Sequence, residues 1–311
     1  MLDQQLARAC TPPVVMQDLP IGVDPLGADA WAWQEIFAPG VSVGAPPDIF
    51  NTQGQDWGLQ PFVPYKLRAA NYQPFSRILR AAMRHSAALR IDHVMGLFRL
   101  FWIPAGAEKK SGTYVRYRSD EMLAILALES ARAGAFVVGE DLGTVEDGVR
   151  EALDERGVLS YKVMWFEKEA PETYPAHALA AITTHDLPTI AGLWTGADLR
   201  EQEEMGLKPN VEGTKESRES LKCVSGTDED SPISEVILRA HEALATAPSA
   251  VIVAGMEDAL GLEKRPNLPG TLCDQRPNWS MPLPKPLEEI EENALVARLV
   301  EAIQSTRSVK K

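Results

Sequence analysis

The chain has 311 residues, 45% of them apolar, and a formal net charge of −13 from 31 basic and 44 acidic side chains. This acidity argues against a nucleic-acid-binding protein, which needs a basic face, and against a protein that binds anionic membranes. The length allows one large domain or two ordinary ones with a full apolar core.

Six short apolar runs, many of them β-branched, predict buried parallel strands. In chain order they are Val14–Asp24, Leu89–Val94, Ala135–Asp141, Leu159–Phe166, Ala180–Asp186 and Ala250–Asp258. Helical patterns lie between several of them: Gln73–Leu89, Asp120–Ala133 before Gly134, a helix that follows the capping box Thr144–Asp147 and ends near Gly157, and Ser234–Ala247. Alternating strands and helices predict a parallel sheet with helical crossovers.

Three further segments have a different composition. Ala38–Pro64 is rich in glycine and proline, matches no regular element, and is expected to be a long functional loop. The polar stretch from about 197 to 232 is expected to insert exposed helices and loop. The tail Glu288–Ile303 predicts one amphipathic helix.

Six strand–helix units do not close an eight-stranded barrel. We therefore expect an α/β fold of the TIM (β/α)₈ type that is incomplete over residues 1–311, with the third to eighth strands recognisable and the first two units upstream. A complete, smaller α/β fold is the alternative. Two missing strands would leave two open sheet edges, which predicts marginal stability for this chain alone.

Three acidic motifs end or follow predicted strands: Leu89–His93, Val137–Asp141 and Thr183–Asp186. In a (β/α)₈ barrel the chemistry lies at the carboxyl ends of the strands. Cleavage of a glycosidic bond needs one carboxylic acid to protonate the leaving oxygen and one carboxylate to attack the sugar carbon. Asp92, Glu140 and Asp186 are therefore candidate catalytic residues.

The surroundings of each carboxylate suggest its role. Arg90 lies two residues before Asp92, on the same face of the strand, and a guanidinium there favours an ionised nucleophile. Glu140 follows an apolar run, where desolvation raises a carboxyl pKa as a general acid requires. Asp141 alternates to the other face and is expected to cap the next helix. Each motif alone also fits a structural carboxylate at a strand end; the three together are far more specific.

The order of these motifs resembles the α-amylase superfamily, and the flanking sequence is similar to the amylomaltase, or 4-α-glucanotransferase (disproportionating enzyme), family. The matching stretches are Leu19–Asp29, Gly44–Phe50, Gly54–Leu59, Arg90–Pro104, Gly112–Tyr117, Gly139–Val145, Thr184–Gly192 and Asn267–Trp279. They cover most of the chain. The N-terminal part of the family pattern has no counterpart in these residues.

The resemblance implies a retaining transfer of α-1,4-glucan segments between maltooligosaccharides. It makes Asp92 the nucleophile, Glu140 the acid/base and Asp186 the stabiliser of the transition state. It implies substrate contacts at Arg90, His185, Asp48, Trp57, Asn267 and Asp24. The expected partners are maltooligosaccharides and other α-1,4-glucans, with no nucleic acid, no membrane, and neither cofactor nor metal.

Two alternatives remain open at this point: a hydrolase of the same superfamily, and a catalytically inactive glucan-binding chain. Of the seven tryptophans, Trp57 is the one expected to stack on a sugar, since it lies in a glycine-rich segment. A retaining mechanism also predicts that the carboxyl groups of Asp92 and Glu140 lie roughly 5–6 Å apart. The three cysteines are far apart and lack CxxC spacing, and no signal peptide is recognisable, so a cytoplasmic protein is expected.

Overall fold

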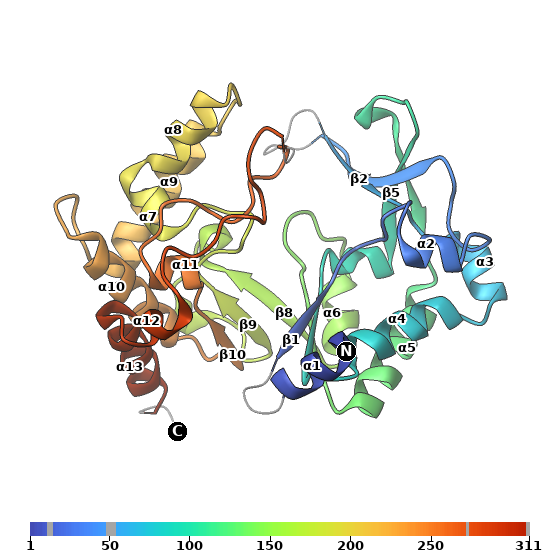
Figure 1. The fold of residues 1–311 in the computed structure, drawn as a ribbon, viewed down its shortest axis with the longest axis horizontal. Helices are drawn as coiled ribbons and strands as arrows, with labels where there is room; N and C mark the ends of the chain where they lie inside the picture. Colours follow the sequence, from blue (N-terminus) through green and yellow to red (C-terminus); the bar gives the residue numbers. More distant parts are fainter. Residues whose placement is uncertain (11–14, 48–53, 272–273, 309–311) are drawn as a thin grey trace. The chain divides into compact units, whose positions relative to one another are not determined.

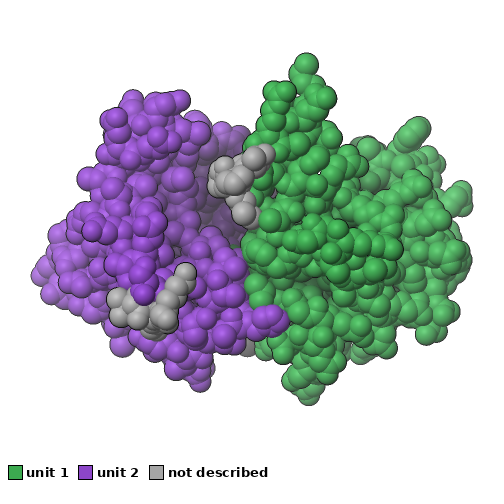
Figure 2. Space-filling model, turned by 90° about the horizontal axis from the view of Figure 1, so that it is seen from below, with its two compact units in different colours: residues 1–161 green, residues 162–311 purple. Residues whose placement is uncertain are grey.

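The computed structural model describes residues 1–10, 15–47, 54–271 and 274–308. The chain forms two compact units, Met1–Tyr161 and Lys162–Lys311, which are coloured separately in Figure 2. Each unit has its own apolar core.

Unit 1 contains parallel strands that begin the predicted sheet. They are β1 (Met16–Leu19), β4 (Ala88–Ile91), β7 (Phe136–Gly139) and β8 (Val158–Val163), the last of which crosses the unit boundary. In the register, Ile91 pairs with both Leu19 and Gly139. The residues that follow these positions, Asp92 and Glu140, therefore leave neighbouring strands at the same level of the sheet.

The helices of unit 1 are α1 (Leu2–Ala9), α2 (Ala28–Ala32), α3 (Pro64–Ala69), α4 (Gln73–Met83), α5 (Ser119–Ala133) and α6 (Val149–Asp154). Helices α4 and α5 bury Leu79, Leu123 and Leu126 against the strands. Helix α5 ends as predicted at Gly134, whose φ of 65° is the left-handed conformation that glycine adopts without strain. The predicted capping box was wrong: α6 begins after Gly148, and no side chain caps it.

An antiparallel sheet also lies in unit 1, with the order β3-β2-β5-β6. Its strands are β2 (Val41–Ala45), β3 (Gln55–Leu59), β5 (Arg99–Pro104) and β6 (Thr113–Arg116). The expectation of an irregular loop over Ala38–Pro64 was therefore wrong. A Cβ at Gly44 would lie 2.0 Å from the carbonyl oxygen of Gln55, so the strands approach too closely there for any side chain. The glycine that hid the strand pattern is the residue that this pairing requires.

Unit 2 pairs β9 (Ala178–Ala181) with β10 (Val251–Val253) in parallel. Its helices are α7 (Ile190–Thr195), α8 (Ala197–Glu204), α9 (Val211–Ser225), α10 (Ile233–Ala245), α11 (Met256–Ala259), α12 (Leu287–Glu291) and α13 (Ala294–Ser308). Helix α10 packs against α9 and α13 and is the centre of this core (Figure 1). The predicted tail helix is two helices, because the side chain of Asn293 accepts the N–H groups of Leu295 and Val296 and starts α13.

The parallel sheet has the strand order β1-β4-β7-β8-β9-β10. This confirms the predicted α/β fold with six strands of an incomplete barrel. The strands end earlier than predicted: β4 ends at Ile91 and β9 at Ala181. The acidic residues Asp92, Glu140 and Asp186 therefore lie on the loops that follow the strands. None of the helices that the structure describes is long and apolar enough to span a bilayer.

Candidate active site

Glu140 is held by the turn that follows β4. His93 has a φ of 45°, the left-handed conformation that is uncommon outside glycine. This turn directs two successive N–H groups at Glu140: the N–H of His93 donates to Oε2 at 2.8 Å, and that of Val94 donates to the backbone oxygen at 2.9 Å. The N–H of Leu142 donates to Oε1 at 2.8 Å. The strain at His93 therefore serves to position Glu140.

Burial is the largest influence on Glu140 and raises its pKa to about 7. The N–H donors of Leu142 and His93 act against burial, while the negative charge of Asp92 raises the pKa further. A carboxyl group with this pKa keeps its proton through much of the neutral range. This is the property that a general acid needs.

Asp92 belongs to a chain of charges across β1 and β4. Arg90 donates through Nη2 to Oδ1 of Asp92 at 2.9 Å, as its position two residues earlier predicted. The other nitrogen, Nη1, donates to both carboxylate oxygens of Asp18 at 2.7 and 2.8 Å. Burial lowers the pKa of Arg90, but the charges of Asp18 and Asp92 outweigh it and raise the pKa above its ordinary value. The guanidinium is therefore permanently charged beside Asp92.

Asp18 is a site residue that the sequence analysis missed. It lies on β1 directly opposite Arg90 in the strand register. Its one sequence signal was an acidic residue inside a mostly apolar run, which does not show what that residue contacts. Asp141 also departs from expectation: it does not cap α6 but is buried, where it accepts hydrogen bonds from Arg150, Ser160 and the N–H of Tyr161. It ties the loop after β7 to β8.

A pocket of about 350 Å³ opens beside Asp92 in unit 1. Asp24, Asp92 and His93 line it together with apolar residues of β1, β4 and α4. The side chain of Asp24 also accepts the N–H of Leu26, which shapes the loop after β1. Burial lowers the pKa of His93 to about 4, so its imidazole is neutral at pH 7 and can both donate and accept hydrogen bonds.

Trp57 lies next to this pocket. Its ring meets the imidazole of His93 edge to face, with centroids 5.4 Å apart, and its Nε1 donates to Gln55. It lies on β3 and not in the loop that the sequence suggested, so the antiparallel pair of β2 and β3 brings it next to His93 in the turn after β4. Asp48, the other residue expected from this segment, lies outside the described residues.

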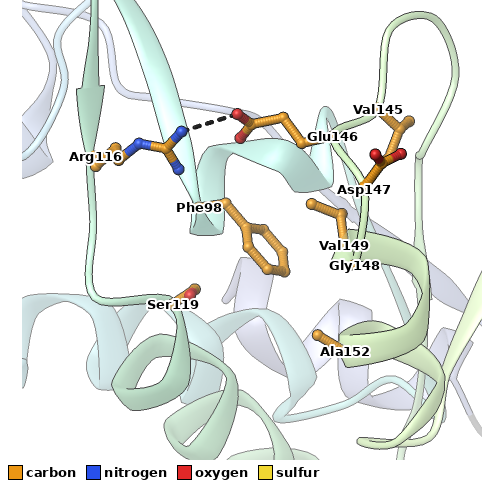
Figure 3. Close-up of a pocket in the computed structure, with 9 residues that line it drawn as sticks. All are labelled: Phe98, Arg116, Ser119, Val145, Glu146, Asp147, Gly148, Val149 and Ala152. Atoms are coloured by element: carbon orange, nitrogen blue, oxygen red, sulfur yellow. Dashed lines mark hydrogen bonds and ion pairs between the residues drawn. The ribbon is translucent and has the colours of Figure 1, made fainter.

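A larger pocket of about 720 Å³ in unit 1 contains none of the predicted residues. Figure 3 shows Phe98 at its centre, Val149 and Ala152 to one side, and the ion pair of Arg116 with Glu146 above. We place the candidate active site at the smaller pocket, because Asp92 and His93 line it and the backbone N–H of His93 holds the carboxyl group of Glu140. Size alone does not select a catalytic site.

In unit 2, Asp186 is held on the loop between β9 and α7. Asn267 donates through its amide to Oδ1 of Asp186 at 2.6 Å, and its backbone N–H donates to the oxygen of His185 at 3.1 Å. The Nε2 atom of His185 lies 3.4 Å from Oδ2 of Asp186. The structure thus brings together the three site residues predicted for this unit.

A buried network stabilises the loop of Asp186. Arg265 donates to the backbone oxygen of Asp186 at 2.7 Å and pairs with Asp198 of α8, their side chains being 7% and 4% exposed. Arg276 donates to the backbone oxygen of Arg265 and pairs with Glu201. Helix α8 therefore acts as an anchor for the loop, a role that its polar sequence did not reveal.

Comparison with known proteins identifies the family. The family model described as 4-alpha-glucanotransferase matches residues 4–288. The chain belongs to the 4-alpha-glucanotransferase family. A 4-alpha-glucanotransferase from Mycobacterium tuberculosis is 42% identical over 340 residues, which cover 98% of this chain and 46% of that relative. The chain thus spans about half the length of the curated relatives that it matches.

Solved structures agree with this membership. Amylomaltase from Corynebacterium glutamicum aligns with a TM-score of 0.90 and 36% identity over 97% of this chain and 48% of its own. Amylomaltase from Streptococcus agalactiae, solved in complex with acarbose, aligns with a TM-score of 0.75 over 94% of this chain and 57% of its own. At 20% identity, the second supports the fold alone. The family assignment made from the motifs is confirmed.

Proposed function

We propose that this 4-alpha-glucanotransferase family member transfers α-1,4-glucan segments between maltooligosaccharides by a retaining double displacement. The observation that supports the proposal most strongly is the contrast between two carboxyl groups of unit 1. Asp92 lies against the permanent charge of Arg90, while Glu140 is mostly buried and has a pKa of about 7. Two carboxyl groups with environments that separate their protonation states are the acid and nucleophile of such a mechanism.

In the first step the Asp92 carboxylate attacks the anomeric carbon and Glu140 donates its proton to the glycosidic oxygen. The bond to the leaving glucan breaks and a glycosyl ester of Asp92 forms. In the second step Glu140, now a carboxylate, takes the proton of an incoming glucan hydroxyl, which attacks the same carbon and releases Asp92. A retaining geometry needs the two carboxyl groups close together, and their separation of roughly 5–6 Å stays a prediction.

We propose that the remaining site residues bind sugar hydroxyl groups or stabilise positive charge on the sugar. The neutral imidazole of His93 and the edge of Trp57 suit a sugar beside Asp92. In unit 2, Asp186, Asn267 and His185 form a compact group of hydrogen-bonding side chains, and Asp186 is proposed to stabilise positive charge in the transition state. These roles follow the family pattern and the local contacts within each unit.

Product analysis on maltotriose tests this proposal. Both longer and shorter maltooligosaccharides are expected, with none formed by Asp92→Asn. Glucose and maltose alone would show that water is the acceptor and would support a hydrolase. Binding of maltotriose without products would support a glucan-binding chain. A fast reaction from Asp92→Asn would refute the assigned nucleophile.

A further inference from the structure

Trp279 stands out in unit 2 because its side chain is exposed and its backbone is strained. Its exposed fraction is 64%, and its φ is 60°. A bulky residue in the left-handed region is an outlier that persists only where the surroundings enforce it. Such strain, combined with an apolar ring left in water, indicates a residue that has a purpose outside the core.

The surrounding loop is braced by buried polar groups. Asn278 is 6% exposed, and its Oδ1 accepts hydrogen bonds from the N–H of Leu268 and from Arg276. Its amide donates to Thr271, and the N–H of Trp279 donates to the oxygen of Pro266 at 3.0 Å. These bonds fix the chain at residues 278 and 279. The indole is therefore presented from a rigid frame.

The indole lies beside the group of polar side chains that holds Asp186. Its ring centroid is 4.8 Å from that of His185, with the planes tilted by 54°, so the two rings are not stacked face to face. His185 in turn lies 3.4 Å from Asp186, to which Asn267 donates. An apolar ring next to carboxylate and amide groups matches a pyranose, which has an apolar C–H face and a rim of hydroxyl groups.

We propose that Trp279 is a stacking platform for a glucose ring of the bound glucan, a residue role that rests on the proposed function. Asp186, Asn267 and His185 would bind the hydroxyl groups of that sugar while the indole covers its apolar face. Withdrawing roughly 60 Å² of apolar surface from water corresponds to about tenfold in affinity. The platform therefore contributes to binding and leaves the chemical step to the carboxylates.

Calorimetric titration of maltotriose into the Asp92→Asn chain tests the platform without turnover. Trp279→Gly and Trp279→Asn remove the ring and accept the left-handed backbone, so their melting temperatures should equal or exceed that of the parent while their affinity falls about tenfold. Trp279→Phe should recover most of the affinity. The matched control is Trp31→Ala, which removes another exposed tryptophan in unit 1 and should bind as the parent does.

Unchanged affinity in Trp279→Gly, or a loss of stability with no loss of affinity, would overturn the platform and make Trp279 structural. Failure of the Asp92→Asn parent to bind maltotriose would overturn both the platform and the proposed function. Binding that depends on Trp279 but yields no products in the chain with Asp92 intact would support the platform and refute the proposed transfer.

Discussion

Replacing Glu140 by glutamine should change how stability depends on pH. In the folded chain Glu140 keeps its proton up to about pH 7, whereas the ordinary value is 4.5. Between these values the folded state binds more protons than the unfolded state, so the free energy of unfolding falls as pH rises. From pH 5 to pH 8 this difference amounts to about 2–3 kcal/mol. Glutamine does not titrate and removes the dependence.

The amide of the variant also places an NH₂ group against one of the backbone N–H donors of His93 and Leu142. This mismatch costs about 1–3 kcal/mol but is the same at every pH. The quantity to compare is therefore the free energy of unfolding of Glu140→Gln minus that of the wild type. This difference should rise by about 2–3 kcal/mol from pH 5 to pH 8, because only the wild type loses stability.

Urea unfolding of both proteins at several pH values measures this directly. Glu151→Gln, which removes an exposed carboxylate on the nearby helix α6, is the matched control and should follow the wild type. Parallel stability profiles for Glu140→Gln and the wild type would show that Glu140 is an ordinary carboxylate. The reasoning that makes it the general acid would then fail.

Three further predictions concern rate, packing and the sheet edge. The initial rate on maltotriose should fall about tenfold per pH unit above about pH 7, as Glu140 loses its proton, and a flat profile to pH 9 would exclude it as the acid. Asp198→Asn leaves the buried charge of Arg265 without its charged partner and should lower the free energy of unfolding by about 3–5 kcal/mol. The control Glu235→Gln breaks the exposed ion pair with Arg239 and should cost under about 1 kcal/mol. Urea unfolding measures both. Strand β1 stands at an edge of the described sheet, so adding the part of the Mycobacterium tuberculosis relative that this chain does not match should raise the melting temperature. An unchanged melting temperature would contradict an exposed pairing edge.

The elements in which apolar residues recur at regular spacing could be predicted from the sequence. Apolar runs identified the six parallel strands of the described sheet, and Gly134 marked the end of α5 correctly. The hairpin of β2 and β3 was missed because Gly44 and the neighbouring prolines interrupt its alternation, although the close approach of the strands requires that glycine. The capping box failed because a left-handed glycine, Gly148, starts α6.

In the candidate site, contacts between residues close in the sequence were predictable and contacts between distant residues were not. The pairing of Arg90 with Asp92 followed from alternation along one strand, and the raised pKa of Glu140 followed from its apolar surroundings. What depends on contacts between distant segments was out of reach. Asp18 lies 72 residues from Arg90 and Arg265 lies 79 residues from Asp186, and no local pattern announces either contact. The left-handed turn at His93 was equally hidden, since histidine, although enriched in this conformation, adopts it in only a small share of cases.

The most direct test of the account is to trap the glycosyl-enzyme. The chain is incubated with a fluorinated α-glucosyl fluoride, which forms the ester quickly and releases it slowly, and digested for mass mapping. The account predicts one added glucosyl group on the peptide that contains Asp92, and none in Asp92→Asn. A glucosyl group on Glu140 or on another residue, or turnover of maltotriose with no trapped ester, would contradict it.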